Sequence, residues 1–349
     1  MSNIRSNFNQ SFKCNHKYEY NMVPQTGKKV VADLQQRSKR GLRFAKNVMK
    51  KEKMEHPKLR QALNHYLYYW NDFTHAGLFS AACEVVGGNY EKIIPTQASI
   101  AMMAAAFDIH DDIIDKSNIK QKIPTVFGKF GIEMALLLGN AFLIEGYKLF
   151  VDSTKDLSEK KRDIALDKIK ELLFQVGNAH ALEVGMKESK KFTPKNYFKI
   201  TELKAASVEA DMYLGALFGG GKKTEIESLA KIGRILGILA TLRDDLIDVF
   251  DIEELNTRLS VNDLPLPLIF AMEDQKVQKK TSRIIAKPCL TDQDIVELVD
   301  ATLEAKPVIE LKEKMKKLIN KGLRLTKTLP VSITRSKIQL ILSFMLEDL

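Results

Sequence analysis

Cysteine is scarce in this 349-residue sequence, which has three: Cys14, Cys83 and Cys289. They lie far apart and lack CxxC spacing, which argues against the disulfide framework of a secreted protein and is typical of a reducing interior. The six histidines form no HExxH motif and have no cysteine partners, so no zinc site is indicated. We therefore expect a cytoplasmic protein.

Long apolar runs are also missing. No stretch reaches about 18 uninterrupted apolar residues, so we expect no transmembrane helix. The N-terminal segment is polar, has Glu19 as its only acid, and lacks the apolar core of a signal peptide. We expect residues 1–30 to form a basic, flexible tail, with a short organelle-targeting segment as the alternative. No shift in composition divides the rest, so residues 31–349 are predicted to be a single catalytic domain.

Acidic residues are fewer than basic ones, and the formal net charge is +10. A basic surface suits nucleic acid, an anionic membrane or phosphorylated small molecules. The lysines are spread along the chain without a stripe interleaved with aromatics, so nucleic acid is not an expected partner. No amphipathic basic helix requires a membrane, and association with a membrane surface is the alternative to a freely cytoplasmic protein. Lysines on solvated helix faces account for most of the excess charge.

Alternating β-branched runs are almost absent, and helical periodicity replaces them. From about Val30 onward apolar residues recur at spacings of three and four, as they do over residues 226–236. Pro124, Pro194 and the loop Gly219–Gly221 are among the residues that interrupt this pattern. They divide the chain into roughly ten helices. The predicted fold class is all-α.

Two segments contain the pattern DDxxD, 133 positions apart (244 minus 111). Residues i and i+4 of a helix share a face, so the first and last aspartates of each motif lie side by side with the middle one on the flank. One such motif is equally well explained as a solvated helix face. Two near-copies with apolar neighbours indicate core helices, where clustered carboxylates repel one another and are costly to desolvate.

Divalent cations compensate such clusters. Mg²⁺ takes oxygen ligands and is usually held by one or two carboxylates together with substrate phosphates. Two facing clusters would clamp a diphosphate through bridging ions, which act as a Lewis acid on the departing pyrophosphate. The predicted catalytic and metal-binding residues are Asp111, Asp112, Asp115, Asp244, Asp245 and Asp248.

The two motifs and their surroundings resemble the trans-prenyl diphosphate synthase family from about Leu63 to the C-terminus. Supporting matches are the Gly87-Gly88-Asn89 turn, His110 before the first motif, and Lys204 in Glu-Leu-Lys-Ala-Ala. The resemblance implies an isoprenoid synthase bundle of about ten or more helices around a central cavity, three Mg²⁺ ions, an allylic prenyl diphosphate substrate and a homodimer.

The same resemblance implies roles for five further residues. Lys120, Lys204 and Arg258 fall at positions that bind the substrate diphosphate. Ala106 and Phe107 precede the first motif, where the family's residues set the depth of the cavity. A core aromatic is an equally good interpretation of Phe107.

The sequence departs from the family where chain-elongating members bind isopentenyl diphosphate. Asp72 and His75 replace a lysine and an arginine before Gly87, Ala104 replaces a His or Gln, and Gln121 replaces an arginine after the first motif. A diphosphate near Asp72 meets repulsion. A shifted signature at Lys58 and Arg60 is the alternative, although it lies about four helical turns too far away.

The metal site is therefore retained while the isopentenyl diphosphate site is altered. We predict a Mg²⁺-dependent enzyme that ionises an allylic prenyl diphosphate and then cyclises the cation, as terpene synthases of this fold do, or transfers it to another acceptor. The first alternative is an ordinary trans-prenyl diphosphate synthase with a remodelled acceptor site. The second is a non-catalytic subunit of a heterodimeric synthase, although such subunits usually lose the aspartate motifs.

Overall fold

The computed structural model describes residues 25–120, 122–189, 193–250, 255, 258, 264–287 and 291–347. Helices dominate this part of the chain, and the all-α prediction is confirmed. The helices of the first half are α2 (Gln25–Lys51), α3 (Pro57–Tyr69), α4 (Thr74–Val85), η1 (Tyr90–Ile93), α5 (Ile94–Ile114), α6 (Val126–Phe130), α7 (Ile132–Ser153) and α8 (Glu159–Ser189). Those of the second half are α9 (Pro194–Lys204), α10 (Ala206–Phe218), α11 (Lys223–Phe250), α13 (Leu266–Ala271), α14 (Gln275–Ile285), α15 (Asp292–Glu304), α16 (Lys306–Leu325), η2 (Thr326–Thr328) and α17 (Ile333–Phe344).

One small hairpin interrupts the helices after the first aspartate motif. Strand β1 (Ile119–Lys120) pairs antiparallel with β2 (Ile123–Pro124), so that Lys120 lies opposite Ile123. This hairpin delivers Lys120 to the end of α5.

Local sequence explains where several helices begin. Thr193 caps α9 by accepting a hydrogen bond from the backbone N–H of Asn196, and Pro194 occupies the first turn, where its missing N–H costs nothing. Thr291 and Asp294 form a reciprocal capping box at α15. The predicted break at Gly219–Gly221 separates α10 from α11.

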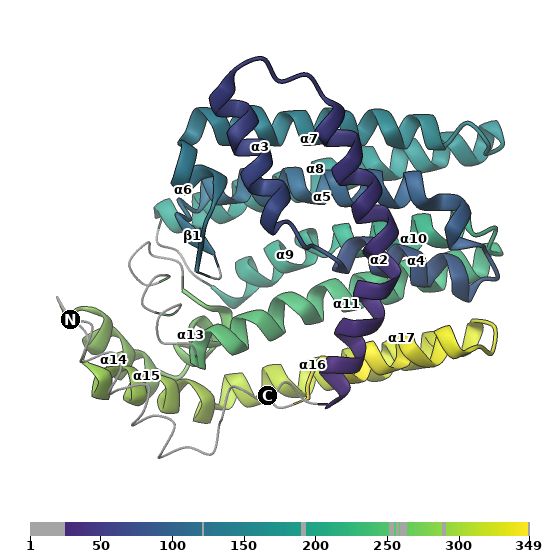
Figure 1. Cartoon of the computed structure of the whole chain (residues 1–349). Coiled ribbons are helices and arrows are strands. Elements are labelled where there is room, and N and C mark those ends of the chain that lie inside the picture. The colour runs from purple at the N-terminus through teal and green to yellow at the C-terminus, as the bar shows by residue number, and fades with distance from the viewer. Residues whose placement is uncertain are drawn as a thin grey trace.

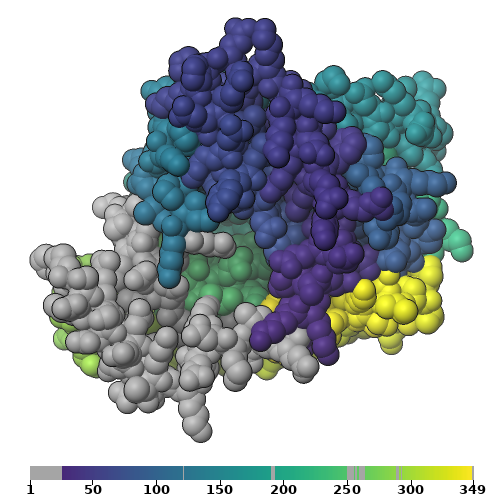
Figure 2. Space-filling view, in the orientation of Figure 1, coloured from purple at the N-terminus to yellow at the C-terminus, as the bar shows by residue number. Residues whose placement is uncertain are grey.

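The helical part of the chain begins earlier than predicted. Helix α2 starts at Gln25, and Val30 and Leu34, one turn apart on the same face, are both buried in the main core. Residues 25–30 therefore belong to the helix and not to the predicted tail, while residues 1–24 lie outside the described range. Helix α2 crosses α4, α5 and α17 (Figure 1). It lies on the face seen in the space-filling view, beside the C-terminal helix α17 (Figure 2).

Close helix packing forms the core. Helix α5 packs along α7, and α10 packs against both α4 and α11. Gly215 lets α10 approach α4, because a Cβ atom there would lie 2.2 Å from the backbone oxygen of Phe79. Cys83 is a buried free cysteine on α4, whereas Cys14 and Cys289 lie outside the described residues.

Helix α7 is, by length and composition alone, apolar enough to cross a membrane, and 33% of its apolar window is buried inside the protein. Its buried face, which includes Leu138, Phe142 and Phe150, packs in the core. Its other face exposes large apolar side chains, namely Ile132, Leu136, Leu137, Ile144 and Tyr147. The apolar character of α7 therefore comes from two separate faces.

Candidate active site

The first aspartate motif lies at the C-terminal end of α5. Ala105 and Ile109 are buried on this helix, and Asp115 is its C-cap residue. The side chain of Asp112 is 2% exposed, whereas those of Asp111 and Asp115 are 31% and 32% exposed. The first and last aspartates thus reach accessible space, and the middle one faces the protein.

Lys120 neutralises the buried aspartate of this motif. Its Nζ atom lies 2.7 Å from Oδ1 of Asp112 and 3.0 Å from Oδ1 of Asp108. Burial raises the pKa of Asp112 to about 6, although Lys120 acts to lower it. Lys120, predicted from the family resemblance to bind the substrate diphosphate, here contacts the first motif. Gln121 lies outside the described residues.

Two basic side chains of α8 approach the other aspartates. His180 Nδ1 lies 3.0 Å from Oδ1 of Asp111, and Lys187 Nζ lies 2.8 Å from Oδ1 of Asp115. Burial acts to raise the pKa of Asp111, but His180 and Lys204 outweigh it and lower that pKa below its ordinary value. Each aspartate of the first motif therefore has a basic side chain beside it.

The second aspartate motif lies near the end of α11 and repeats this arrangement. Asp245 is buried, Asp248 is 26% exposed, and Asp244 is accessible. Arg258 Nη1 donates to Asp245 Oδ1 at 2.8 Å and to Asp248 Oδ2 at 2.6 Å. The hydroxyl of Tyr197 donates to Asp245 at 3.1 Å. Arg258, also predicted to bind the diphosphate, thus contacts the second motif.

Two carboxyl groups of the second motif, those of Asp244 and Asp245, are protonated more easily than ordinary aspartates. Burial, assisted by Asp248 and Asp245, raises the pKa of Asp244 to about 7. Asp244 is nevertheless accessible to solvent. Burial raises the pKa of Asp245 to about 6 against the opposing effect of Arg258. Concentrated negative charge is therefore costly at both motifs.

Helix α9 links the two motifs. Tyr197, in its first half, contacts Asp245, while Lys204, its last residue, lines a pocket together with Asp111. Lys204 Nζ lies 2.6 Å from Oε2 of Glu183. Burial acts to lower the pKa of Lys204, but Glu183 and Asp111 outweigh it and raise that pKa, so the ammonium stays charged.

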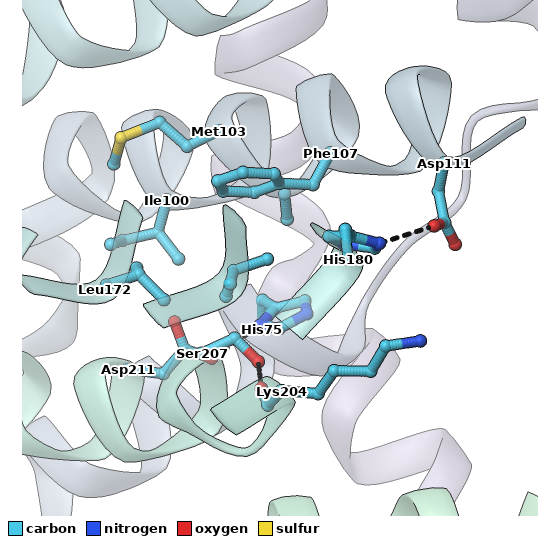
Figure 3. A pocket seen from close by; sticks show the side chains of 12 residues that line it. His75, Ile100, Met103, Phe107, Asp111, Leu172, His180, Lys204, Ser207 and Asp211 are labelled. Carbon is cyan, nitrogen blue, oxygen red and sulfur yellow. Dashed lines mark hydrogen bonds and ion pairs between the residues drawn. The ribbon is translucent and has the colours of Figure 1, made fainter. Parts of the chain in front are cut away.

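A pocket of about 210 Å³ begins at the first motif. Asp111, His180 and Lys204 lie at one end, and Leu172 and Asp211 lie toward the other (Figure 3). The remaining lining residues are His75, Ile100, Met103, Ala104, Phe107, Val176 and Ser207. Among the described residues, none of the second motif lines this pocket. The pocket therefore joins a charged end to a largely apolar wall.

The two residues predicted to line the cavity differ in position. Phe107 lies on the pocket wall, one helical turn before Asp111 (Figure 3). Ala106 is fully buried and belongs to the core cluster that also contains Leu138 and Phe142 of α7. Ala106 does not line this pocket, because consecutive residues of a helix point about 100° apart.

The aspartate motifs fit a divalent cation held partly by its substrate. In the described part of the chain, no three acidic, histidine or cysteine residues form a metal cluster by themselves. Oδ2 of Asp245 is, however, buried without a hydrogen-bond partner. A buried, unpaired carboxylate oxygen is costly, and Mg²⁺ commonly combines one or two carboxylates with phosphate oxygens. Asp111, Asp115 and Asp244, which are accessible, offer further carboxylate oxygens.

Several side chains at these motifs were missed by the sequence analysis. His180, Glu183 and Lys187 share one face of α8, and their spacing of three and four residues was the available signal. Tyr197 carried no such signal, because its contact with Asp245 spans 48 positions.

Comparison with known proteins decides the family. Residues 57–302 match the model of the polyprenyl synthetase family. The chain belongs to this family. The polyprenyl synthetase fold also appears in the structural comparison: a geranylgeranyl pyrophosphate synthetase from Pyrococcus horikoshii superposes with a TM-score of 0.81 and 21% identity, over 92% of this chain and 98% of that one.

Curated relatives of this polyprenyl synthetase are named geranylgeranyl diphosphate synthases. The chloroplastic enzyme of Capsicum annuum is 29% identical over 178 residues, 48% of this chain and 47% of the relative. The Methanosarcina mazei enzyme is 27% identical over 185 residues, 52% of this chain and 56% of the relative. The chain thus spans about half the length of these relatives. Their names support the elongating alternative better than the terpene synthase interpretation.

Proposed function

We propose that this polyprenyl synthetase transfers the prenyl group of an allylic diphosphate to isopentenyl diphosphate and so lengthens the chain. The observation that carries the proposal is the pocket in which Lys204 and Asp111 meet an apolar wall formed by Ile100, Phe107 and Leu172. Such a pocket suits a ligand with an anionic head and a hydrocarbon tail. The named activity of the relatives supports the same reaction.

In this proposal the head group lies at the charged end of the pocket. Lys204 contributes a cation to the phosphate oxygens, and the aspartates of the two motifs would hold Mg²⁺. Mg²⁺, three ions by resemblance to the family, supplies Lewis-acid stabilisation of the departing diphosphate. Phe107, Leu172 and the rest of the apolar wall exclude water from the allylic cation.

Lys120 and Arg258 each stabilise one of the two motifs. Each contacts the buried middle aspartate of one motif, Asp112 or Asp245. With Mg²⁺ held by these carboxylates, Lys120 and Arg258 would have their positive charges available to phosphate oxygens. We therefore keep the prediction that Lys120 and Arg258 bind the substrate diphosphate, in addition to their contacts with the aspartates.

A second candidate is ionisation of the allylic diphosphate without isopentenyl diphosphate, followed by cyclisation, quenching or transfer to an uncharged acceptor. It is favoured by the altered acceptor positions. Asp72 accepts a hydrogen bond from the backbone N–H of Thr74 at 3.0 Å, and His75 is bound to Asp211. Arg60, part of the alternative acceptor signature, donates to the backbone oxygen of Met54. Chain elongation then requires other cations to hold the acceptor diphosphate.

Product analysis distinguishes the two reactions. The purified chain is incubated with Mg²⁺ and C5, C10, C15 or C20 allylic diphosphates, each with and without isopentenyl diphosphate. Longer linear diphosphates formed only with isopentenyl diphosphate support the proposal. Hydrocarbons or alcohols released equally in its absence reject elongation and support the second candidate. Absence of both, with activity restored by a second family member, supports the subunit interpretation.

We also propose that two copies associate through α7. Five large apolar side chains are exposed on this helix, including Leu137 at 50% and Ile144 at 69%, and exposed apolar patches of this kind mark association surfaces. A homodimer would bury them. The cytoplasmic location stays a prediction.

A further inference from the structure

The pocket contains an ion pair that the proposed chemistry does not use. His75 of α4 and Asp211 of α10 both line the pocket, and His75 Nδ1 lies 2.6 Å from Oδ2 of Asp211. The Asp211 side chain is 3% exposed and that of His75 is 25% exposed. The carboxylate is therefore buried, while the imidazole lies across the pocket from Phe107 and beside Ser207 (Figure 3).

The free nitrogen of His75 presents an N–H group to the pocket. In the described part of the chain Nε2 makes no hydrogen bond. Burial opposes protonation of His75, but Asp211, and to a smaller degree Asp72, outweigh it and raise its pKa to about 9. The pair thus shares one proton at neutral pH. Wherever that proton lies between Nδ1 and the carboxylate, Nε2 carries a hydrogen and is a donor.

A hydrocarbon tail cannot satisfy this donor. The rest of the pocket wall is largely apolar and includes Ile100, Met103, Leu172 and Val176. Each methylene group of a tail that packs against these side chains increases the affinity of the ligand. A tail that covers Nε2 of His75 instead removes water from a polar group and offers no acceptor in return. The cavity volume of about 210 Å³ is also below the roughly 300–1,000 Å³ of common ligand pockets. Both features favour a short tail.

We propose that His75 and Asp211 set how far a prenyl tail extends into this pocket, and that they do so through their polarity. This rests on the proposed function, because it takes a prenyl diphosphate as the ligand. The ion pair interrupts the apolar wall, because His75 and Asp211 lie among the apolar side chains that line the pocket. A tail therefore gains affinity with each isoprene unit only until it reaches His75. The two residues are specificity-determining and take no part in bond cleavage.

Binding measurements test the proposal without catalysis. Non-hydrolysable allylic diphosphate analogues with C5, C10, C15 and C20 tails are titrated calorimetrically into the full chain with Mg²⁺. Wild-type affinity is expected to rise with tail length and then stop rising. The variant His75→Leu/Asp211→Leu removes both charges together, so neither is left unpaired. Its affinity should continue to rise for one further C5 unit, by about tenfold.

The matched control is His75→Asn/Asp211→Asn, which keeps hydrogen-bonding groups at both positions and should keep the wild-type length profile. The proposal is overturned if the affinity of the asparagine variant keeps rising beyond the wild-type tail length. It is also overturned if the affinity of the leucine variant stops rising at the same tail length as wild type. A further measurement requires no substitution: an analogue with a hydroxyl at the end of the longest effective tail should bind wild type several-fold more tightly than the plain tail. Absence of that gain also overturns the proposal.

The result is separable from the proposed function. If the wild-type chain forms no product from allylic and isopentenyl diphosphates, the proposed function fails. The length profile still decides the role of His75 and Asp211, because it measures binding alone.

Discussion

Arg258 Nη1 lies 2.6 Å from Oδ2 of Asp248, ten positions earlier in the chain. The same nitrogen contacts the buried Asp245. This guanidinium is thus a protein cation placed where the family resemblance predicts a metal ion. Lys120 holds the corresponding position beside Asp112 in the first motif. The charge of both middle aspartates is therefore balanced by a basic side chain.

Arg258→Ala should lower the free energy of unfolding by about 3 kcal/mol in the absence of divalent cations, because it leaves Asp245 buried without its positive partner. Urea denaturation measures this change. Millimolar Mg²⁺ should recover part of the loss, and Arg258→Lys should lose less. A variant as stable as wild type would show that the contact contributes nothing.

Asp111→Ala and Asp244→Ala should each reduce kcat/KM by roughly 10³, since metal-bound carboxylates contribute several kcal/mol of transition-state stabilisation. Diphosphate release measures the loss. Asp152→Ala is the matched control: this aspartate is 41% exposed on α7 and pairs with surface lysines, so its removal should leave turnover unchanged. Full activity of either motif variant would contradict the metal-binding assignment.

The double variant Asp72→Lys/Gln121→Arg places positive charges at two positions where chain-elongating family members bind isopentenyl diphosphate. The KM for isopentenyl diphosphate should fall, because an acid near that diphosphate is replaced by a base. Losing the hydrogen bond that Asp72 accepts from the Thr74 N–H should cost about 1 kcal/mol of stability. Steady-state kinetics at varied isopentenyl diphosphate measures the effect, and an unchanged KM would place the acceptor elsewhere.

Leu137→Glu/Ile144→Glu should convert the proposed dimer into a monomer. Both side chains are exposed on α7, and burying two carboxylates in an apolar interface is unfavourable. Light scattering coupled to size exclusion measures the mass. Lys148→Ala on the same helix is the control and should keep the wild-type mass. A wild-type chain that is already monomeric would reject the proposed interface.

The His75–Asp211 pair predicts a pH dependence of stability. Burial opposes protonation of His75, but Asp211 and Asp72 raise its folded pKa from 6.5 to about 9. A raised histidine pKa contributes stability that is fully present below pH 6.5 and is lost as pH rises through 9. The stability advantage of wild type over His75→Asn/Asp211→Asn should therefore shrink between these two values. Denaturant titrations across this range measure it, and a constant difference would contradict the shift.

Helical periodicity was sufficient to predict the fold class, because amphipathic spacing is a local property of the chain. The polar composition of residues 25–30 predicts a tail, because the burial of Val30 and Leu34 depends on packing against other helices. The sequence does not distinguish Ala106 from Phe107 for a similar reason. Neighbours in sequence point in different directions, and only the packed helix shows which side is the core.

The sequence by itself determined the helical class, the two aspartate motifs and the family resemblance, since all three reside in residue types and short spacings. Tertiary structure alone decided which aspartate of each motif is buried and which basic side chain lies beside it. It also brought His75 to Asp211 across 136 positions. The physical reason is that burial and charge pairing arise between helices distant in the chain, and no local pattern encodes those distances.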